Sequence, residues 1–263
     1  MNVPFSDAAA TLSVVMPAYN ERDNIRRVIA RVLTRPEVGE LIVVEDGGTD
    51  GTWDELQKLV GTDPRLRILQ QPRNMGKGAA LIRGFSEATR PLVIVQDADF
   101  EYDPDDYPVV IAPLLAGKAD VVYGSRFMST PGQVRNFRHE MGNKFLTFWS
   151  NVFSDIHLSD METCYKAFRR EVIQNLVLNS QRFGIEVEIT AKLAGARRLR
   201  IWEVPVTYAP RWYGEGKKIT WRDGIAAMWH IFKFNTFFDA GRAFRRPWDE
   251  ILDRQTNHNK EEM

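Results

Sequence analysis

The sequence lacks the features on which three common classes of protein depend. Its 263 residues include one cysteine, Cys164, which excludes an intramolecular disulfide and a cysteine zinc cluster and fits a reducing cytosol. Residues 1–11 have neither the basic start nor the long apolar core of a secretory signal. No run of about 18 uninterrupted apolar residues occurs, so we expect no bilayer-spanning helix. These absences together predict a cytoplasmic location.

An excess of charge of either sign is also lacking. Lysine and arginine together number 35, and aspartate and glutamate together also number 35, so the formal net charge is zero. A generic nucleic-acid binder usually carries a basic excess, and we therefore expect no nucleic-acid partner. A chain of this length can bury one large α/β core or two small ones.

The first half of the chain alternates apolar runs with amphipathic stretches. Short apolar runs predict strands, and apolar residues at helical spacing predict the helices between them. The predicted strands are 12–16, 41–44, 66–70, 92–96 and 120–123, and the predicted helices are 25–33, 52–60 and 78–88. We expect Pro17 to end the first strand and Asn20 to cap the helix that follows. This alternation predicts an α/β protein with a mostly parallel sheet flanked by helices.

The pattern changes after Gly124. Residues 125–139 are predicted to form a basic loop. A helix is expected to follow, with one apolar face and a polar face opposite. The apolar face consists of Phe145, Phe148, Trp149 and Val152.

Two further elements are predicted toward the end of the chain. A strand is expected over 199–208, interrupted by Pro205, and a helix over 221–238 that is apolar on nearly every side. A helix of that kind is either buried or in contact with lipid, and burial is the usual outcome. A basic cluster just beyond it supports the lipid alternative. The cluster is Arg242, Arg245 and Arg246.

Two carboxylates, Asp97 and Asp99, follow the predicted strand 92–96 directly. Open α/β sheets bind their ligands at the carboxyl ends of strands. Two carboxylates one residue apart repel each other unless a cation lies nearby, and their oxygens suit Mg²⁺ or Mn²⁺. The alternative is a solvated acidic turn, since the acidic stretch continues to Asp106. The neighbouring strand ends favour the metal site.

The first two predicted strands also end in acidic segments, Pro17–Glu21 and Glu45–Gly51. A tyrosine such as Tyr19 can stack on a base, and nearby carboxylates can hold the base and the ribose hydroxyls. No GxGxxG follows the first strand, and Gly76–Gly78 lacks the spacing of a P-loop, so we expect no dinucleotide cofactor. Singly, the two segments could be an ordinary helix start and an ordinary turn. Together with Asp97 they predict a nucleotide pocket in which a metal ion neutralises a diphosphate.

Taken in order, these residues resemble the family 2 glycosyltransferases with the GT-A fold. Within that family the chain is most similar to the dolichol-phosphate and polyprenyl-phosphate mannose or glucose synthases. The resemblance rests on the segments 17–21, 45–51, 74–78, 96–99 and 124–126, and it continues through 160–168 to about residue 218. It implies an inverting transfer of a hexose from a UDP- or GDP-hexose, with Mg²⁺ or Mn²⁺ as the cofactor.

The resemblance also implies roles for the matching residues. The nucleoside would be held by Pro17, Tyr19, Glu21 and Asp46, beside Glu45, which replaces a common aspartate, and Lys77 of the matched glycine segment. The metal ligands would be Asp97, Asp99 and Glu101, with Glu101 in place of a glutamine that these synthases often carry. The catalytic positions would be Asp99, Asp160 and Arg126. Separately, the glycine-hinged basic loop 211–218, with Lys217, either closes over the donor diphosphate as a lid or stays an exposed loop.

Two kinds of acceptor are compatible with these residues. A phosphate acceptor, with a second pKa of about 6, is already an anion at pH 7 and needs arginines to position it. Arg126, Arg135 and Arg138 would serve that purpose. A sugar hydroxyl needs a general base. Asp160 lies where related hydroxyl-transferring enzymes place that base, and otherwise it is a loop cap or the partner of an arginine.

Three functions follow from these alternatives. They are a membrane-associated polyprenyl-phosphate hexosyltransferase, a cytosolic glycosyltransferase with a hydroxyl acceptor, and a catalytically silent sugar-nucleotide-binding module. The acidic strand ends argue against the silent module, and the arginine loop with the amphipathic helix favours the first function. That function predicts a polyprenyl phosphate acceptor and peripheral contact with the cytoplasmic face of a membrane. The expected divisions are a flexible N-terminus (1–10), a GT-A domain (11–220), apolar and amphipathic C-terminal helices (221–250) and a polar tail (251–263).

Overall fold

The computed structural model of the protein describes residues 10–128, 137–182, 184–196, 198–210, 221–237 and 242–246. Arg135, Lys217 and almost all of both expected terminal segments lie outside these residues. The strands are β1 (Leu12–Ala18), β2 (Val38–Glu45), β3 (Leu66–Gln70), β4 (Leu92–Val95), β5 (Val121–Ser125), β6 (Lys166–Arg169) and β7 (Ile201–Pro205). The helices are α1 (Arg22–Leu33), α2 (Thr52–Gln57), α3 (Lys77–Glu87), the short 3₁₀ helix η2 (Pro104–Asp106), α4 (Tyr107–Leu115), α5 (Phe137–Ser154), α6 (Arg170–Asn175), α7 (Ile185–Gly195) and α8 (Trp221–Thr236).

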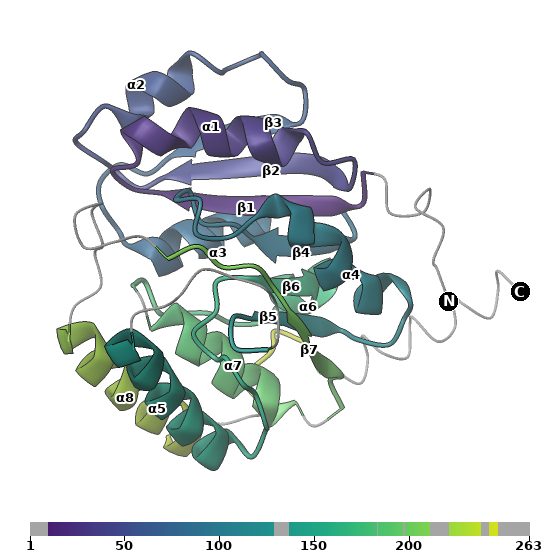
Figure 1. Cartoon of the computed structure of the whole chain (residues 1–263), viewed down its shortest axis with the longest axis vertical. Helices are drawn as coiled ribbons and strands as arrows, with labels where there is room; N and C mark the ends of the chain where they lie inside the picture. The colour runs from purple at the N-terminus through teal and green to yellow at the C-terminus, as the bar shows by residue number, and fades with distance from the viewer. Residues whose placement is uncertain are drawn as a thin grey trace, which may run out of the picture.

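The described strands form one mixed sheet in the order β3-β2-β1-β4-β6-β5-β7 (Figure 1). β1 is parallel to β2 and β4, β2 is parallel to β3, and β5 is parallel to β7. Only β6 runs antiparallel to its neighbours, β4 and β5. The expected α/β class and mostly parallel sheet are therefore confirmed. Because β4 and β5 both oppose β6, the carboxyl ends of β1, β2, β4, β5 and β7 meet at one edge of the sheet.

The first strand runs two residues past its predicted end, because Pro17 lies inside β1 and pairs in register with Val44 of β2. On the other side of β1, the ladder with β4 ends at Val15 and Val95. Val15 turns its carbonyl toward β4, and Pro17, two residues on, faces the same side. No β4 residue lies opposite Pro17 there. The Pro17 nitrogen has no hydrogen to donate, but no strand on that side requires a hydrogen bond from it.

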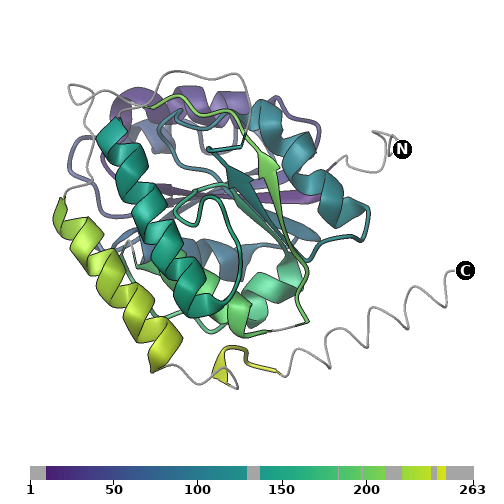
Figure 2. The same ribbon diagram turned by 60° about the horizontal axis from the view of Figure 1, so that its bottom comes forward.

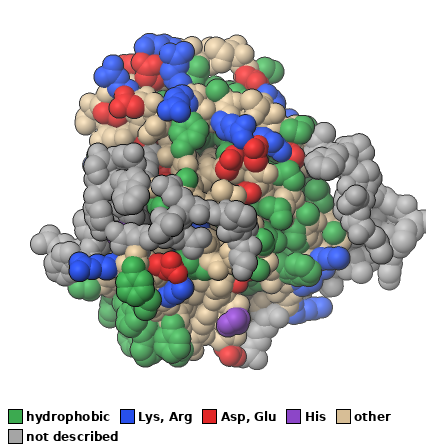
Figure 3. All heavy atoms as spheres, in the orientation of Figure 1, with side chains coloured by type: hydrophobic (Ala, Val, Ile, Leu, Met, Phe, Trp, Pro, Cys, Tyr) green, Lys and Arg blue, Asp and Glu red, His purple; other side chains and the backbone are tan. Residues whose placement is uncertain are grey.

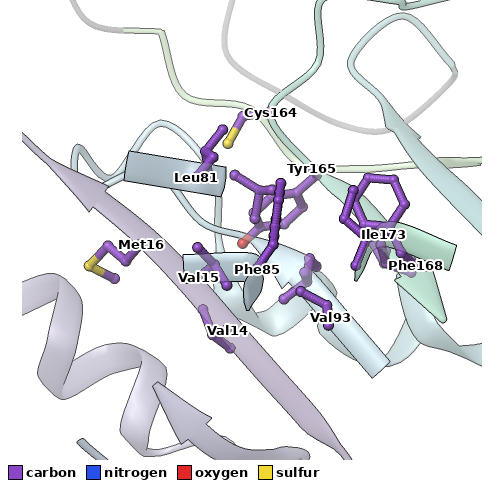
Figure 4. Packing of buried hydrophobic residues seen from close by; sticks show 14 of the residues in the cluster. Val14, Val15, Met16, Leu81, Phe85, Val93, Cys164, Tyr165, Phe168 and Ile173 are labelled. Carbon is purple, nitrogen blue, oxygen red and sulfur yellow. The ribbon is translucent and has the colours of Figure 1, made fainter. Parts of the chain in front are cut away.

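The central strands are buried on both faces, which explains their nearly continuous apolar sequences. Helices α1 and α4 lie over one face of the sheet, and α3 and α6 lie over the other (Figure 1). The packing of the second face is shown in Figure 4, where Leu81 and Phe85 of α3 and Ile173 of α6 lie over Val15 of β1 and Val93 of β4. This core fixes the strand ends on which the site is built.

Helices α5 and α8 lie side by side, with α7 against both, in both views of the ribbon (Figures 1 and 2). The predicted loop 125–139 is wrong at its end, because α5 begins at Phe137 and includes Arg138 and His139. The usual burial expected for 221–238 is also wrong for one face of α8. Ile231 is fully buried, whereas Trp229 is 59% exposed. The helix packs on α7 with one face and leaves the other face open.

The amphipathic helix α5 is oriented with its apolar face toward solvent. Phe145 and Phe148 are 54% and 58% exposed, whereas Thr147 and Ser150 on the polar face are buried. The Thr147 hydroxyl accepts a hydrogen bond from the backbone N–H of Met161 at 3.1 Å, so the polar face is the one that the fold uses. Hydrophobic side chains gather over α5 on the surface in Figure 3.

Candidate active site

The predicted site residues converge on the carboxyl edge of the sheet, where β1 has β2 on one side and β4 on the other. A crossover point of this kind is where open α/β sheets bind ligands. Asp97 and Asp99 follow β4, and Phe100 after them adopts a left-handed backbone with φ of +61°. A bulky residue rarely adopts that conformation, and here it turns the acidic stretch back across the edge.

Asp97 is paired with Lys77, the residue between two glycines at the start of α3. The Lys77 ammonium nitrogen lies 2.9 Å from Oδ1 of Asp97 and 3.1 Å from Oδ2. Burial opposes the charged form of both groups, but the Asp97 carboxylate raises the pKa of Lys77 well above its usual value. In return, the Lys77 ammonium lowers the pKa of Asp97 against the effect of burial. Both groups are therefore held charged at neutral pH.

Lys77 is held in place by close packing on both sides. A Cβ atom added at Gly76 would lie 2.5 Å from the carbonyl oxygen of Gln181, and one added at Gly78 would lie 2.1 Å from that of Ser180. Gly76 also has a φ of +97°. Only glycine fits these two positions, because the turn carrying Lys77 packs directly against the chain before α7.

A second buried acid and a second buried lysine extend this arrangement. Glu186, at the start of α7, lies with Oε1 3.5 Å from the Lys77 ammonium and Oε2 2.5 Å from that of Lys166. Glu186 is the second residue of α7 and lies in its first turn. Lys166 opens β6 and escaped prediction because a short mixed-polarity strand gives no apolar signal. Glu188, two residues on, pairs instead with Lys192.

Asp99 and Glu101 have hydrogen-bond partners that differ from the Lys77 partner of Asp97. Oδ1 of Asp99 accepts a hydrogen bond from the backbone N–H of Glu101 at 3.1 Å, and Oε2 of Glu101 accepts one from the Tyr208 hydroxyl at 2.8 Å. No group of three or more His, Cys, Asp or Glu side chains in the described part of the chain is placed to hold a metal ion together. Asp97 and Asp99 are nevertheless only two residues apart, and both follow β4 at the ligand-binding edge of the sheet.

The segment after β1 forms the opposite side of the site. Tyr19 is half-buried there, and Pro17 precedes it at the end of the strand. The expected cap at Asn20 is wrong, because Asn20 has a φ of +52° and α1 takes Glu21 as its N-terminal flanking residue. The Asn20 side chain instead accepts a hydrogen bond from the backbone N–H of Thr49 at 2.8 Å. This bond ties the segment after β1 to the glycine turn after β2.

Glu45 and Asp46, at the end of β2, differ in how many partners they have. Both oxygens of Asp46 accept hydrogen bonds, from the backbone N–H groups of Met75 and Gly76 at 2.8 Å and from the Gln71 side chain at 2.9 Å. Glu45 is fully buried, and its Oε2 has no hydrogen-bond partner among the described residues. An unsatisfied buried carboxylate oxygen is costly, so Glu45 is the less satisfied of these two acids.

Arg126 and Asp160 form a buried ion pair beyond β5. The Arg126 Nε and a terminal nitrogen lie 2.7 Å from the two Asp160 oxygens, and the Arg126 backbone N–H donates to Asp160 at 2.9 Å. The guanidinium also lies over the Tyr208 ring, 5.2 Å from its centroid. Burial disfavours the charge, but Asp160 raises the pKa of Arg126 well above its usual value. Of the alternatives for Asp160, partnership with an arginine is the one seen.

Two residues around this pair were missed in the sequence. Glu203 of β7 accepts hydrogen bonds from the backbone N–H groups of Ser159 and Asp160 at 2.9–3.1 Å. Tyr208 follows β7 and reaches both Glu101 and Arg126. Knowing that β7 runs parallel to β5 would have placed both residues at the ligand edge, but that pairing is not visible in a single sequence.

Near the Arg126–Asp160 pair, Glu162 is an acid whose pKa is strongly raised. Its Oε1 is buried and has no hydrogen-bond partner among the described residues. Burial raises the pKa of Glu162 to about 7, with Glu186 and Asp160 adding to the shift and Lys166 and Arg126 opposing it. The single cysteine, Cys164, is buried two residues away, as expected for a packed residue.

A model of one protein family, described as glycosyl transferase family 2, matches residues 13–177. The chain is 30% identical over 212 residues to a dolichol-phosphate mannosyltransferase of Pyrococcus furiosus, covering 78% of the chain and 58% of that protein. It is 31% identical over 247 residues to the low-salt glycan biosynthesis hexosyltransferase Agl6 of Haloferax volcanii, covering 92% of the chain and 57% of that protein. The chain thus spans less than three fifths of the length of these two relatives.

A third relative and a solved structure complete the comparison. A polyprenol monophosphomannose synthase of Mycolicibacterium smegmatis is 29% identical over 213 residues, which cover 78% of the chain and 79% of that protein. The fold is similar to that of glucosyl-3-phosphoglycerate synthase from Mycobacterium tuberculosis, with a TM-score of 0.69 and 21% identity over 92% of the chain and 88% of that protein. Another structure of that synthase contains Mn²⁺, uridine diphosphate and phosphoglyceric acid, and it has a TM-score of 0.67 at 20% identity over 92% of the chain and 86% of that protein. The likeness confirms the expected GT-A architecture.

Proposed function

The chain belongs to glycosyl transferase family 2, and we propose that it transfers a hexose from a nucleoside-diphosphate sugar to a polyprenyl phosphate. The observation that carries the proposal is the convergence of the acidic ends of β1, β2 and β4 with Lys77 at one edge of the sheet. Two of the relatives at 30% and 29% identity are named as dolichol-phosphate or polyprenol mannose synthases, which supports the acceptor.

The nucleoside of the donor is assigned to the edge formed by β1 and β2. Tyr19 supplies a half-buried ring for stacking, and Glu45 supplies the buried oxygen that lacks a partner. Glu21 and Asp46 are the other two acids that we assign to the nucleoside site. Asp46 contributes indirectly, because it accepts hydrogen bonds from the backbone of Met75 and Gly76 and so holds that turn in place. Pro17 stiffens the end of β1 beneath them. A UDP- or GDP-hexose fits this group of residues, and the sequence has no segment with the spacing of a P-loop to bind its phosphates.

A divalent metal fits the donor set that Asp97 and Asp99 provide. Two carboxylates separated by one residue at a ligand edge are hard oxygen donors of the kind that Mg²⁺ and Mn²⁺ prefer, and Glu101 adds a third such group nearby. When bound, the ion supplies Lewis-acid neutralisation of the leaving diphosphate. A structural neighbour contains Mn²⁺ together with uridine diphosphate, which supports the same assignment.

The chain's own charges then bind and orient the reacting groups. Lys77 is a fixed cation beside Asp97 and is placed to contact the donor diphosphate, and Lys217 is proposed for the same role. Arg126, held by Asp160 and stacked on Tyr208, is a preoriented cation for the acceptor phosphate. A phosphate is an anion at pH 7, so attack on the sugar's anomeric carbon requires no side chain to remove a proton.

The apolar face of α5 and α8 supports a lipid acceptor. The aromatic residues on it form a connected set, with Trp149 against Phe153 and Phe153 against Phe232 at centroid separations of 6.0 Å. Large exposed apolar patches mark protein or membrane contact sites. No helix in the described residues is long and apolar enough to cross a membrane. The exposed aromatic rings lead us to assign this face to peripheral contact with a membrane surface, where the acceptor's chain would lie.

A hydroxyl acceptor is the less supported alternative, because it needs a base. Asp160 is the candidate for that base, and both of its oxygens are held by Arg126. The two acceptors are separated by measuring nucleoside diphosphate release from a panel of UDP- and GDP-hexoses, with polyprenyl phosphate or simple glycosides as acceptors. Release that depends on polyprenyl phosphate and on Mg²⁺ or Mn²⁺ is the expected result. Transfer to a glycoside but not to the lipid phosphate would overturn the proposal.

A further inference from the structure

A second concave surface lies outside the active site, between α8 and the chain that leads into α7. It is a cavity of about 580 Å³ that is open to solvent. Its walls are the segment 179–182 with Gly184 on one side and the last turns of α8 on the other. The residues from α8 and just after it are His230, Lys233, Phe234 and Phe237.

The cavity carries positive charge that the rest of the fold does not neutralise. Arg182 and Lys233 line it and are exposed, and neither forms an ion pair within the described ranges. Glu188 is the acidic group that acts on His230, and it is already engaged by the Lys192 ammonium and by the backbone N–H groups of Asn179 and Ser180. Among the described residues, an anion entering the cavity would therefore meet cations without a competing free carboxylate.

His230 gives the cavity a polar group that lacks a partner. Its Nδ1 is buried and makes no hydrogen bond to any described residue. The ring is fixed by stacking on Phe234, with centroids 5.7 Å apart and an angle of 11° between the planes. A buried ring nitrogen without a partner is rare in a folded protein, so His230 leaves one polar group of the cavity wall unsatisfied among the described residues.

The surroundings of the cavity are apolar. Phe237 at its rim is 71% exposed, and Trp229 on the neighbouring face of α8 is 59% exposed. Basic residues beside exposed aromatic rings are the pattern of a protein segment that lies at a membrane interface. A small soluble anion would gain nothing from these rings, whereas a lipid presents a phosphate and an apolar chain together.

We propose that this cavity binds the phosphate headgroup of an anionic phospholipid of the membrane surface. Arg182 and Lys233 contact the phosphate, and Phe237 and Trp229 enter the acyl region. The inference rests on the membrane contact proposed above and adds a specific lipid site to it. Because Ser180 and Gln181 also pack against the turn that carries Lys77, the bound headgroup would lie next to the donor site and hold it at the membrane surface.

Vesicle co-sedimentation of the full chain, without donor or acceptor, tests the site. The vesicles are phosphatidylcholine alone, or equal parts of phosphatidylcholine and phosphatidylglycerol. The double variant Arg182→Gln/Lys233→Gln should lose about 30-fold in affinity for the anionic vesicles, since each basic residue near such a surface is worth about 1 kcal/mol. The matched control is Lys58→Gln/Lys118→Gln, which removes two exposed charges elsewhere and should change affinity far less.

Three results would overturn the proposal. They are equal losses in the two double variants, no preference for anionic vesicles, or tight binding of inorganic phosphate that competes with vesicles, which would make the cavity a site for a free anion. Thermal unfolding of each variant shows that it is folded. Transfer to polyprenyl phosphate in detergent is measured in parallel. Retained transfer with lost vesicle binding assigns the defect to this cavity, and absent transfer in the unaltered protein would count against the proposed reaction alone.

Discussion

Arg126 holds Asp160 through both carboxylate oxygens, at 2.7 Å on each side, and the pair is buried behind the end of β5. Two residues that were assigned separate catalytic roles from the sequence are thus each other's partners. A buried carboxylate engaged in this way is a poor candidate for a proton acceptor, because protonation would break the pair. The Asp160 carboxylate is instead well placed to hold Arg126 at the position where an acceptor phosphate would bind.

The first prediction concerns this pair. Asp160→Asn should keep the rate of transfer to polyprenyl phosphate within about tenfold of that of the unaltered protein, because we expect Asp160 not to act as a general base. Loss of a general base would instead lower the rate by about 10²–10⁴-fold. Stability should fall by about 1.5–3 kcal/mol, the range for a hydrogen bond to a charged group. Urea unfolding and single-turnover rates measure the two effects.

Asp120→Asn is the matched control for stability. Asp120 is also buried and is held by Arg200 at 2.7 Å, but it lies at the opposite end of β5. A folded Asp160→Asn protein that is more than about 100-fold slower in kcat than the Asp120→Asn protein, with an unchanged KM for the acceptor phosphate, would identify Asp160 as the base and favour a hydroxyl acceptor.

The second prediction concerns the metal. Asp99→Ala should lower kcat/KM by more than about 100-fold, because even the residues that merely orient metal ligands are worth 10–100-fold. Isothermal calorimetry should also show that Mn²⁺ no longer strengthens nucleoside diphosphate binding. Asp105→Ala, a few residues on, is the control, because Asp105 pairs with Arg31 and Arg35 on the surface. Equal losses in the two variants would mean that Asp99 matters only for the acidic turn.

The central strands of the sheet could be predicted because they are buried on both faces. A continuous apolar run such as that of β2 gives a clear signal, and β3 was predicted to the residue. β6 and its antiparallel direction could not be predicted, because Lys166–Arg169 is short and half of it is charged. The strand order therefore emerged only from the fold, and with it the place of Glu203 and Tyr208.

The convergence of acids at the candidate site could be predicted where the acids lie directly after apolar strands. Asp97, Asp99 and Asp46 were found in that way. The partners of these acids were not, since pairs such as Lys77 with Glu186 depend on how α7 packs on the turn before α3. The outward-facing side of α5 was also unpredictable, because amphipathicity shows that a helix has two faces but not which face the fold buries.

The third prediction concerns the nucleoside. Tyr19→Ala should raise the KM for the donor by about 5–150-fold, because base stacking on an aromatic side chain is worth about 1–3 kcal/mol. The kcat should change little, since stacking is equally strong in the ground state and the transition state. Tyr19→Phe retains the ring and should behave like the unaltered protein. A Tyr19→Ala protein with an unchanged KM would remove this residue from the nucleoside site.

The fourth prediction concerns the apolar face. Phe148→Ser together with Phe145→Ser should reduce flotation with vesicles and leave the free energy of unfolding almost unchanged, because both side chains are more than half exposed. Burying such a side chain in lipid is worth about 1.5–3 kcal/mol, so the pair should lower binding by at least about 100-fold. Val60→Ser is the control, an exposed apolar residue at a distant place. If the doubly substituted protein still floats, or if the unaltered protein forms dimers that the substitutions dissolve, the face binds another protein surface instead.

The last prediction concerns the pH dependence of stability. Burial raises the pKa of Glu162 to about 7 from its usual 4.5. Below about pH 4.5 the carboxyl is protonated in both the folded and the unfolded chain, so its stabilising contribution is complete. As the pH rises toward 7, the unfolded chain releases the proton first, and the folded protein loses as much as about 3 kcal/mol.

Glu162→Gln removes this titration and keeps the size of the side chain. The variant should therefore be more stable than the unaltered protein at pH 8, and the difference should shrink steadily as the pH falls to 5. Urea unfolding across that range measures it, with Glu171→Gln as a control for a less buried acid whose pKa is also raised by burial. A constant difference across the range would show that Glu162 is ionised in the folded protein at every pH tested, held in its charged form by Lys166 and Arg126.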